Sequence, residues 1–326
     1  MYFLKNKEKI KIDINIISFY IIRMQNEMEI KENTIYNEDC LKYMERLKEQ
    51  NIKVDCIVLD PPYFNVVNEK WDKEWKSLEE YLNWIENIFE KCNAVSKYNC
   101  NLWLFGFPYQ LSYLIPLAEK HGFTYRQHIT IDKGLQSVAG RTSDKLKMFP
   151  TSTEYVIYFH KEARHVIKEY LQEKKKESKK TSTEINLHLG KAINGGGTWS
   201  TIAGLKQKNI QYPTRTDWDK LQELFGKFDI EYDDYVFMFN IETRLTDVWS
   251  DINFYDRTYK KVHPTQKPFK LIERLLNCTT KEGYKVLDPF MGSGMTGLVC
   301  KKMRRTYYGC EKDEKYCSKT IIDMQV

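Results

Sequence analysis

A short apolar run that ends in two adjacent prolines constrains the fold of this chain more than any other feature. The run Val54-Asp55-Cys56-Ile57-Val58-Leu59 predicts a buried strand. Asp60-Pro61-Pro62-Tyr63 follows it, and because prolines donate no ladder hydrogen bonds, the strand must end there. Asp60 and Tyr63 then lie at its carboxyl end, where open α/β sheets bind ligands. A carboxylate, a rigid carbonyl and an aromatic ring suit a planar base that carries an amino group, although the motif alone also fits a simple strand-ending turn.

A second strand, near the end of the chain, leads into a glycine-rich turn. Residues 284–288 read as the strand, and Pro289-Phe290-Met291-Gly292-Ser293-Gly294 reads as the turn before a helix. Glycines allow positive φ and a close approach of the backbone to a ligand. The next strand signal, at residues 305–311, ends in an acid suited to ribose hydroxyls. This arrangement is typical of a nucleoside-binding site.

The same glycines leave a second cofactor class open. Gly292, Gly294 and Gly297 satisfy the G-x-G-x-x-G pattern of nicotinamide and flavin enzymes. Asp288 lies just before them, and its negative charge suits a cationic ligand better than a pyrophosphate. Hydride chemistry would also leave the prolyl motif without a role.

The chain resembles the DNA amino-methyltransferases, in the beta class whose catalytic motif precedes its cofactor motif. Residues 60–63 match the catalytic quartet, and residues 288–294 match the cofactor glycines. Residues 36–41, 263–268 and 311–316 are similar to three further segments that the family uses for its cofactor. The similarity covers residues 33–163 and 256–320. It departs from the family at Asn37-Glu38, which replaces a usual glycine, and at Met295, which replaces a common threonine.

The resemblance implies an α/β fold, a Rossmann-like methyltransferase with a doubly wound, mostly parallel sheet. Alternating strand and helix patterns on both flanks of the chain agree with it. We expect an N-terminal extension at 1–28, a catalytic domain made of 29–163 and 256–326, and an inserted target-recognition region at 164–255. Within that insertion, Arg215 is the first candidate for contact with a base edge.

The function implied is transfer of a methyl group from S-adenosylmethionine to the N6 amino group of adenine in a flipped-out base of double-stranded DNA. Aspartate at the first quartet position favours adenine, and N4-cytosine methylation is the alternative. A non-catalytic nucleic-acid-binding protein on the same fold is the alternative of another class. The catalytic residues implied are Asp60, Pro61, Pro62 and Tyr63. The cofactor contacts implied are Asp39, Cys40, Asp60, Thr265, Gln266, Lys267, Asp288, Phe290, Gly292, Ser293, Gly294, Thr296 and Glu311.

Net charge, cysteine spacing and apolar stretches indicate where the protein works and what it binds. The net charge of +6 is compatible with a polyanionic partner such as DNA. The eight cysteines show no metal-ligand spacing, so we expect reduced thiols, no metal and a cytoplasmic enzyme. The apolar stretch at residues 14–22 is far shorter than the roughly 20 residues needed to span a membrane. The sequence leaves open whether the enzyme is a homodimer and whether a cognate restriction endonuclease accompanies it.

Local patterns predict several elements. Helices are expected at 41–47 and 77–94, the second capped by Ser77, and strands at 101–106, 123–132 and 154–160. Residues 134–150 predict a basic loop that either faces DNA or is simply solvated. Gly195-Gly196-Gly197 is not expected to hold a phosphate, because no strand precedes it and no helix is signalled directly after it.

Overall fold

The computed structural model describes residues 29–64, 73–138, 148–192, 197–204, 210–236, 239–240, 245–256, 258–259 and 261–323. Its centre is an eight-stranded sheet of order β1-β8-β7-β2-β3-β5-β4-β6. Among these strands β5 runs antiparallel to both of its neighbours, and the other pairings are parallel. The mostly parallel sheet predicted from the sequence is therefore confirmed. The strands are β1 (Thr34–Asn37), β2 (Val54–Leu59), β3 (Ser96–Phe105), β4 (Phe123–Asp132), β5 (Thr153–Lys161), β6 (Val248–Trp249), β7 (Lys285–Asp288) and β8 (Thr306–Glu311).

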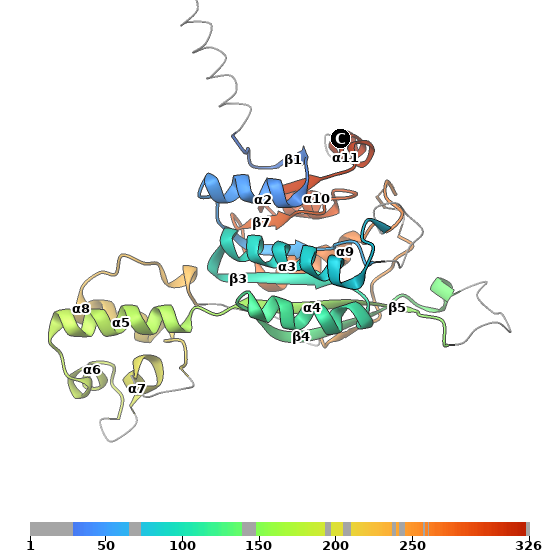
Figure 1. Cartoon of the computed structure of the whole chain (residues 1–326). Coiled ribbons are helices and arrows are strands. Elements are labelled where there is room, and N and C mark those ends of the chain that lie inside the picture. The colour runs from blue at the N-terminus through green and yellow to red at the C-terminus, as the bar shows by residue number, and fades with distance from the viewer. Residues whose placement is uncertain are drawn as a thin grey trace, which may run out of the picture.

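Helices cover both faces of the sheet (Figure 1). One apolar core packs α2 (Cys40–Glu49), α3 (Leu78–Val95) and α4 (Pro108–Lys120) against one face. A second core packs α9 (Phe269–Thr279) and α10 (Met295–Lys302) against the other face, and Cys317 of α11 (Glu314–Asp323) joins it. This three-layer arrangement is the doubly wound architecture that the alternating patterns predicted.

Helix α3 illustrates how local sequence sets these elements. The Ser77 side chain caps the helix by accepting a hydrogen bond from the Glu80 amide at 3.1 Å. Tyr81, Ile85 and Phe89 lie on its buried stripe, as the spacing predicts. The predicted helix and its cap are confirmed. The Glu80 carboxylate accepts from the Lys76 amide at 2.9 Å.

The parallel pairing of β2 with β7 creates a topological switch point. Cys56 is in register with Val286, and Ile57 with Leu287. From β2 the chain crosses through α3 to β3 on one side, and from β7 it crosses through α10 to β8 on the other side. The two connections diverge at the carboxyl ends of β2 and β7, and such a divergence leaves a crevice where ligands bind.

The inserted region forms a separate helical lobe of α5 (Arg164–Ser178), α6 (Ser182–His188), α7 (Thr198–Ala203) and α8 (Arg215–Phe225). The lobe has its own apolar core, which includes Trp199 and Trp218. Because β5 runs antiparallel to β3, the chain enters α5 at the amino ends of the parallel strands. Figure 1 shows the lobe beyond one end of the strands and the β4–β5 connection beyond the other.

The end of the expected insertion belongs to the catalytic sheet instead. Strand β6 pairs with β4, with Thr130 beside Val248. Trp249 and Ile252 are buried in the core that also contains α9. The helical lobe thus ends before residue 245, whereas the sequence placed the boundary at 255.

The glycine run at 195–197 also differs from expectation. Gly197 caps α7, so a helix does follow the glycines, while the preceding element is α6 rather than a strand. A Cβ atom at Gly197 would lie 2.4 Å from the Asn186 amide nitrogen and 2.4 Å from the Ala192 carbonyl oxygen. Close packing within the lobe therefore accounts for this glycine.

Several expectations concern residues outside the described part, namely the extension at 1–28 and the basic centre of the loop at 139–147. All eight cysteines are buried and carry no disulfide, as expected. Among the helices that the structure describes, none is both long and apolar enough to cross a membrane.

Gly309 of β8 supports the loop that follows β7. A Cβ atom at Gly309 would lie 2.4 Å from the Met291 methyl carbon and 3.0 Å from the Asp288 carbonyl oxygen. Real Cβ atoms do not approach other atoms as closely as 2.4 Å, so any side chain at 309 must displace the Met291 side chain.

We therefore predict that Gly309→Ala lowers the free energy of unfolding by about 1–3 kcal/mol, the usual cost of overpacking a close-packed interior. Urea-induced unfolding followed by circular dichroism measures this change. An unchanged unfolding midpoint would contradict the close packing of β8 against the loop.

Candidate active site

A cavity of about 780 Å³ opens at the carboxyl ends of β2 and β7. Its volume lies within the range of small-molecule and cofactor sites. The cavity brings together segments that are distant from one another in the sequence. Of the residues expected at the site, it is lined by Asp39, Cys40, Asp60, Pro61, Pro62, Tyr63, Thr265, Gln266, Lys267, Asp288, Phe290, Gly292, Ser293, Thr296 and Glu311.

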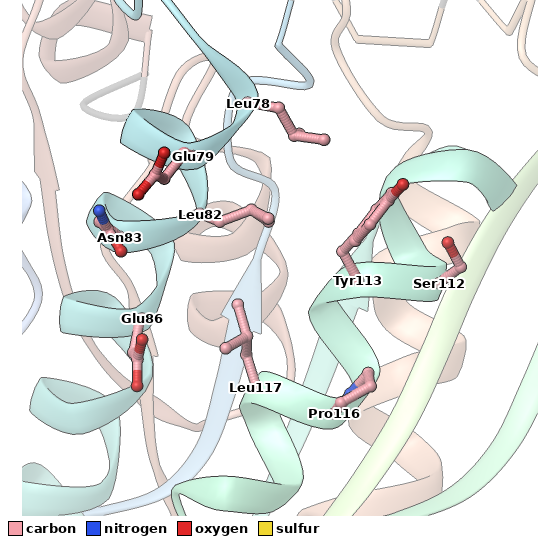
Figure 2. A pocket seen from close by; sticks show the side chains of 9 residues that line it. All are labelled: Leu78, Glu79, Leu82, Asn83, Glu86, Ser112, Tyr113, Pro116 and Leu117. Atoms are coloured by element: carbon pink, nitrogen blue, oxygen red, sulfur yellow. The ribbon is translucent and has the colours of Figure 1, made fainter.

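A second cavity, of about 500 Å³, lies between α3 and α4 (Figure 2). Leu78, Leu82 and Leu117 line it together with Tyr113. Glu86, at its wall, binds Lys120 and His121. None of the residues expected at the site lies there. It is a groove between two helices, away from the switch point.

Residues 60–63 direct a carboxylate and a phenol into the larger cavity. The Tyr63 hydroxyl donates to Asp60 Oδ1 at 2.6 Å. Burial and the Asp60 carboxylate raise the pKa of Tyr63 well above its ordinary value, so the phenol stays protonated and remains a donor. The backbone on either side is held as well, because Tyr81 donates to the Pro62 carbonyl at 2.8 Å and Gln110 donates to the Tyr63 carbonyl at 2.8 Å.

Lys267 lies against the quartet. Its ammonium contacts Asp60 Oδ2 at 2.9 Å and Glu154 Oε1 at 3.3 Å, and it donates to the Tyr63 hydroxyl at 3.2 Å. Burial by itself lowers the pKa of Lys267, but attraction to the two carboxylates outweighs it and raises the pKa above its ordinary value. The sequence predicted a cofactor contact for Lys267, whereas every polar partner found here belongs to the catalytic side of the cavity.

The other side of the cavity is acidic. Asp288 is buried at the end of β7, and its carboxylate accepts from the Phe290 amide at 2.9 Å. Burial raises the pKa of Asp288 to about 7. The Glu311 carboxylate also contributes to this raised pKa, and Asp39 and Lys312 line the same cavity. A buried carboxylate beside another one fits a positively charged ligand, because the ligand would supply a counter-charge.

The glycine turn has the backbone geometry that its sequence predicts. Gly292 has φ of +49° and Gly294, which caps α10, has φ of +74°. Glu311 holds this turn, because one carboxylate oxygen accepts from the Gly292 amide at 2.8 Å and the other from the Asp313 amide at 2.8 Å. A carboxylate accepts about four hydrogen bonds, so Glu311 can also bind hydroxyl groups.

Asp39 and Cys40 form the start of α2 at the cavity wall. The Asp39 carboxylate accepts from the Leu41 amide at 3.0 Å and caps the helix. Burial raises the pKa of Cys40 to about 12, so its thiol stays protonated. The pair shapes the wall of the cavity and offers no thiolate.

The segment at 263–268 folds as a compact turn. Gln266 accepts from the Val262 amide at 2.9 Å, and the Thr265 hydroxyl lies 3.0 Å from His263 Nδ1. The His263 ring packs against Tyr316, with 4.4 Å between ring centroids. These contacts stabilise the turn that positions Lys267 against Asp60.

Two site residues carried no role in the sequence interpretation. Glu154 is the second residue of β5 and Lys133 follows β4, and their side chains meet at 3.2 Å. Both line the cavity. The sequence could have indicated this contact, because the two residues lie at the end of one predicted strand (123–132) and at the start of the next (154–160). Charged residues at these positions meet when the two strands pair antiparallel.

Arg215, expected to read a base, lies at the start of α8 in the helical lobe. Its guanidinium binds Asp233 at 2.5 Å and stacks on Tyr232 at 4.1 Å from the ring centroid. Asp233 also binds Lys281 at 3.0 Å, which follows α9. These contacts connect the lobe to the catalytic domain.

Comparisons with known proteins identify the family. A family model described as DNA methylase, of the N6/N4 type, matches residues 54–322. The type II methyltransferase M1.MboII of Moraxella bovis is 25% identical over 87% of this chain and 93% of its own length. The type II methyltransferase M2.DpnII of Streptococcus pneumoniae is 25% identical over 86% of this chain and 85% of its own length.

Two solved structures share the fold. That of the M1.HpyAVI–SAM complex has a TM-score of 0.54 at 20% identity and covers 90% of this chain and 99% of its own. The structure of the cytosine-N4-specific PvuII DNA methyltransferase has a TM-score of 0.53 at 14% identity. It covers 90% of this chain and 89% of its own. The family model covers most of the chain and includes both halves of the cavity. The chain therefore belongs to the family of S-adenosylmethionine-dependent DNA methylases that modify the amino nitrogen of adenine (N6) or cytosine (N4).

Proposed function

We propose that this protein is a site-specific DNA methyltransferase that methylates the N6 amino group of adenine. The observation that carries the proposal is the position of Asp60, at the carboxyl end of β2 and at hydrogen-bonding distance from both Tyr63 and Lys267. Aspartate in the first position of the quartet favours adenine in the family that the chain resembles. Cytosine N4 is the second candidate.

Some residues of the cavity would bind the cofactor, and others would bind the target base. Asp288, Glu311 and the turn at Gly292 and Gly294 would hold S-adenosylmethionine, together with Asp39, Cys40 and Phe290. Thr265, Gln266, Ser293 and Thr296 belong to the same set of cofactor contacts that we expected from the sequence. Asp60 and Lys267, which were also in that set, bind each other on the other side of the cavity. The acidic lining suits the positive charge of this cofactor. When bound, S-adenosylmethionine supplies an electrophilic methyl group.

Asp60 would activate the amino group of the base. That nitrogen is a weak nucleophile because its lone pair is delocalised into the ring. The Asp60 carboxylate and the Pro61 carbonyl would accept its two N–H bonds and favour a tetrahedral nitrogen with an available lone pair. As the nitrogen forms its bond to the methyl carbon, the methyl–sulfur bond would break and S-adenosylhomocysteine would leave, and the nitrogen would release one proton to solvent. Positioning and fixed charges supply most of the acceleration.

The target base must leave the duplex to reach Asp60, because the cavity encloses this carboxylate. The Tyr63 ring lines the cavity and packs edge-on against Phe107, with 5.2 Å between centroids. We propose that one face of the flipped base stacks on Tyr63.

Duplex DNA would then lie across the carboxyl ends of the strands. Two segments border the cavity there, the β4–β5 connection through Lys133 and Ser137 and the segment after β6 through Phe254 and Tyr255. The helical lobe lies at the opposite ends of the strands (Figure 1). We therefore assign target recognition to residues 248–255 of the expected region and to the β4–β5 connection.

The enzyme's product identifies the target base. In cells without other DNA methylation, expression of the protein should give methylated adenines at one recurring sequence by modification-aware sequencing. Asp60→Asn keeps the size of the side chain but removes the charged acceptor, so methylation should fall about 10²-fold or more. Methylated cytosine would identify an N4 enzyme. DNA binding without any methylation would indicate the non-catalytic alternative.

Cofactor affinity should depend on the charge of Asp288. Because its pKa is about 7, the carboxyl is mostly protonated at pH 6 and mostly ionised at pH 8. A cationic ligand prefers the ionised form, so S-adenosylmethionine should bind more weakly as the pH falls below 7, by up to about tenfold per pH unit. Isothermal titration measures this. Asp288→Asn should abolish the dependence, and neutral adenosine should not show it. A flat profile in the unmodified protein would exclude Asp288 as the counter-charge.

DNA affinity should depend on the β4–β5 connection. Leu135 is 84% exposed and Phe149 is 95% exposed, at its two ends. Exposed apolar side chains beside a base-flipping cavity can contact unstacked bases. Phe149→Ala should therefore raise the KM for DNA roughly tenfold, the scale of one base-stacking contact. Leu187→Ala, which changes an exposed leucine on α6 of the lobe, is the matched control. A raised KM in Leu187→Ala together with an unchanged KM in Phe149→Ala would assign DNA contact to the lobe.

A further inference from the structure

The Lys267 ammonium is enclosed by three oxygen atoms on the base-binding side of the cavity. They are Asp60 Oδ2 at 2.9 Å, Glu154 Oε1 at 3.3 Å and the Tyr63 hydroxyl at 3.2 Å. The Lys267 side chain is 9% exposed. A lysine ammonium has three N–H donors, and these three contacts account for all of them.

Glu154 binds the Lys267 ammonium and a second lysine, Lys133. One Glu154 oxygen contacts Lys267 at 3.3 Å, and the other contacts Lys133 at 3.2 Å. Burial by itself would raise the pKa of Glu154, but the two lysines outweigh it and lower the pKa, so the carboxylate is charged. Asp60, Lys267, Glu154 and Lys133 thus form a row of alternating charges with no net charge. Removing one member leaves a buried charge without its partner.

The row fixes the orientation of the Asp60 carboxylate. Tyr63 binds Oδ1 and Lys267 binds Oδ2, so the carboxylate is held from two sides. It accepts about four hydrogen bonds in all, which leaves room for the amino group of a base. The Lys267 ammonium also lies 4.8 Å from the centroid of the buried Phe105 ring, and this apolar wall limits access of water. Electrostatic contacts are stronger in such surroundings.

We propose that Lys267 and Glu154 are positioning residues for methyl transfer: Glu154 fixes the ammonium of Lys267, and Lys267 fixes the carboxylate of Asp60. This role deepens the proposed function and rests on it. It replaces the cofactor contact expected for Lys267 from the sequence. A cation that already has three oxygen partners offers no donor to the cofactor, and its charge would repel the positive charge of S-adenosylmethionine.

The test compares kcat with cofactor affinity in purified full-length variants. Lys267→Met should lower kcat about 10²-fold, the scale of misplacing a catalytic group by about 1 Å. The Kd for S-adenosylmethionine should stay within about twofold of the unmodified protein. Glu154→Gln preserves size and should lower kcat about tenfold. Because both residues act through Asp60, the double variant should lose no more than Lys267→Met alone. Lys48→Met, on the exposed side of α2 where Lys48 binds Glu45, is the matched control and should leave kcat unchanged.

Several results would overturn the proposal. A rise in the cofactor Kd that matches the loss of kcat would make Lys267 a cofactor contact. Losses that multiply in the double variant would show that the two residues act independently. Unchanged kcat in Glu154→Gln, whose fold is checked by its melting temperature, would remove Glu154 from the mechanism even if Lys267→Met fails to fold. Absence of methyl transfer by the unmodified protein would instead defeat the proposed function together with this role.

Discussion

The parallel pairing of β2 with β7 holds the two halves of the site together. Val54–Leu59 and Lys285–Asp288 are distant in sequence, yet Ile57 and Leu287 lie side by side in the sheet. This pairing places Asp60 and Asp288 at neighbouring strand ends, where the crossover connections diverge. Both apolar cores maintain it, because the faces of these strands pack against helices on either side. A register shift here would separate the base-binding side of the cavity from its acidic side.

Buried charge is the second constraint on the site. The base-binding side is balanced, since Lys267 and Lys133 offset Asp60 and Glu154. On the acidic side, burial raises the pKa of Asp288 to about 7. An uncompensated carboxylate is costly in the free protein, and a cationic ligand would relieve that cost. Under the proposed function, one side would take a neutral base and the other a positively charged cofactor.

Sequence patterns predicted those parts of the site that depend on local backbone chemistry. The prolines after Leu59 end β2, and Gly292 and Gly294 adopt positive φ, as their residue types require. The contact between Lys267 and Glu154 could not be predicted, because it depends on how β5 pairs with β3 and on the fold of the turn at 263–268. The position of the helical lobe depends on the direction of β5, and the apolar pattern of a strand does not specify its direction. The lobe therefore lies away from the cavity, although its place in the sequence indicated target recognition.

A crystal structure of the protein with S-adenosylhomocysteine and a short DNA duplex that contains its recognition sequence would show whether both ligands occupy this cavity. We expect the cofactor product to lie against Asp288, Glu311 and the turn at Gly292. We also expect an adenine to leave the duplex and to place its amino nitrogen within hydrogen-bonding distance of Asp60, with Lys267 still bound to that carboxylate. A cofactor bound outside this cavity, or a target base that reaches other residues while Asp60 stays remote from it, would rule out the proposed mechanism.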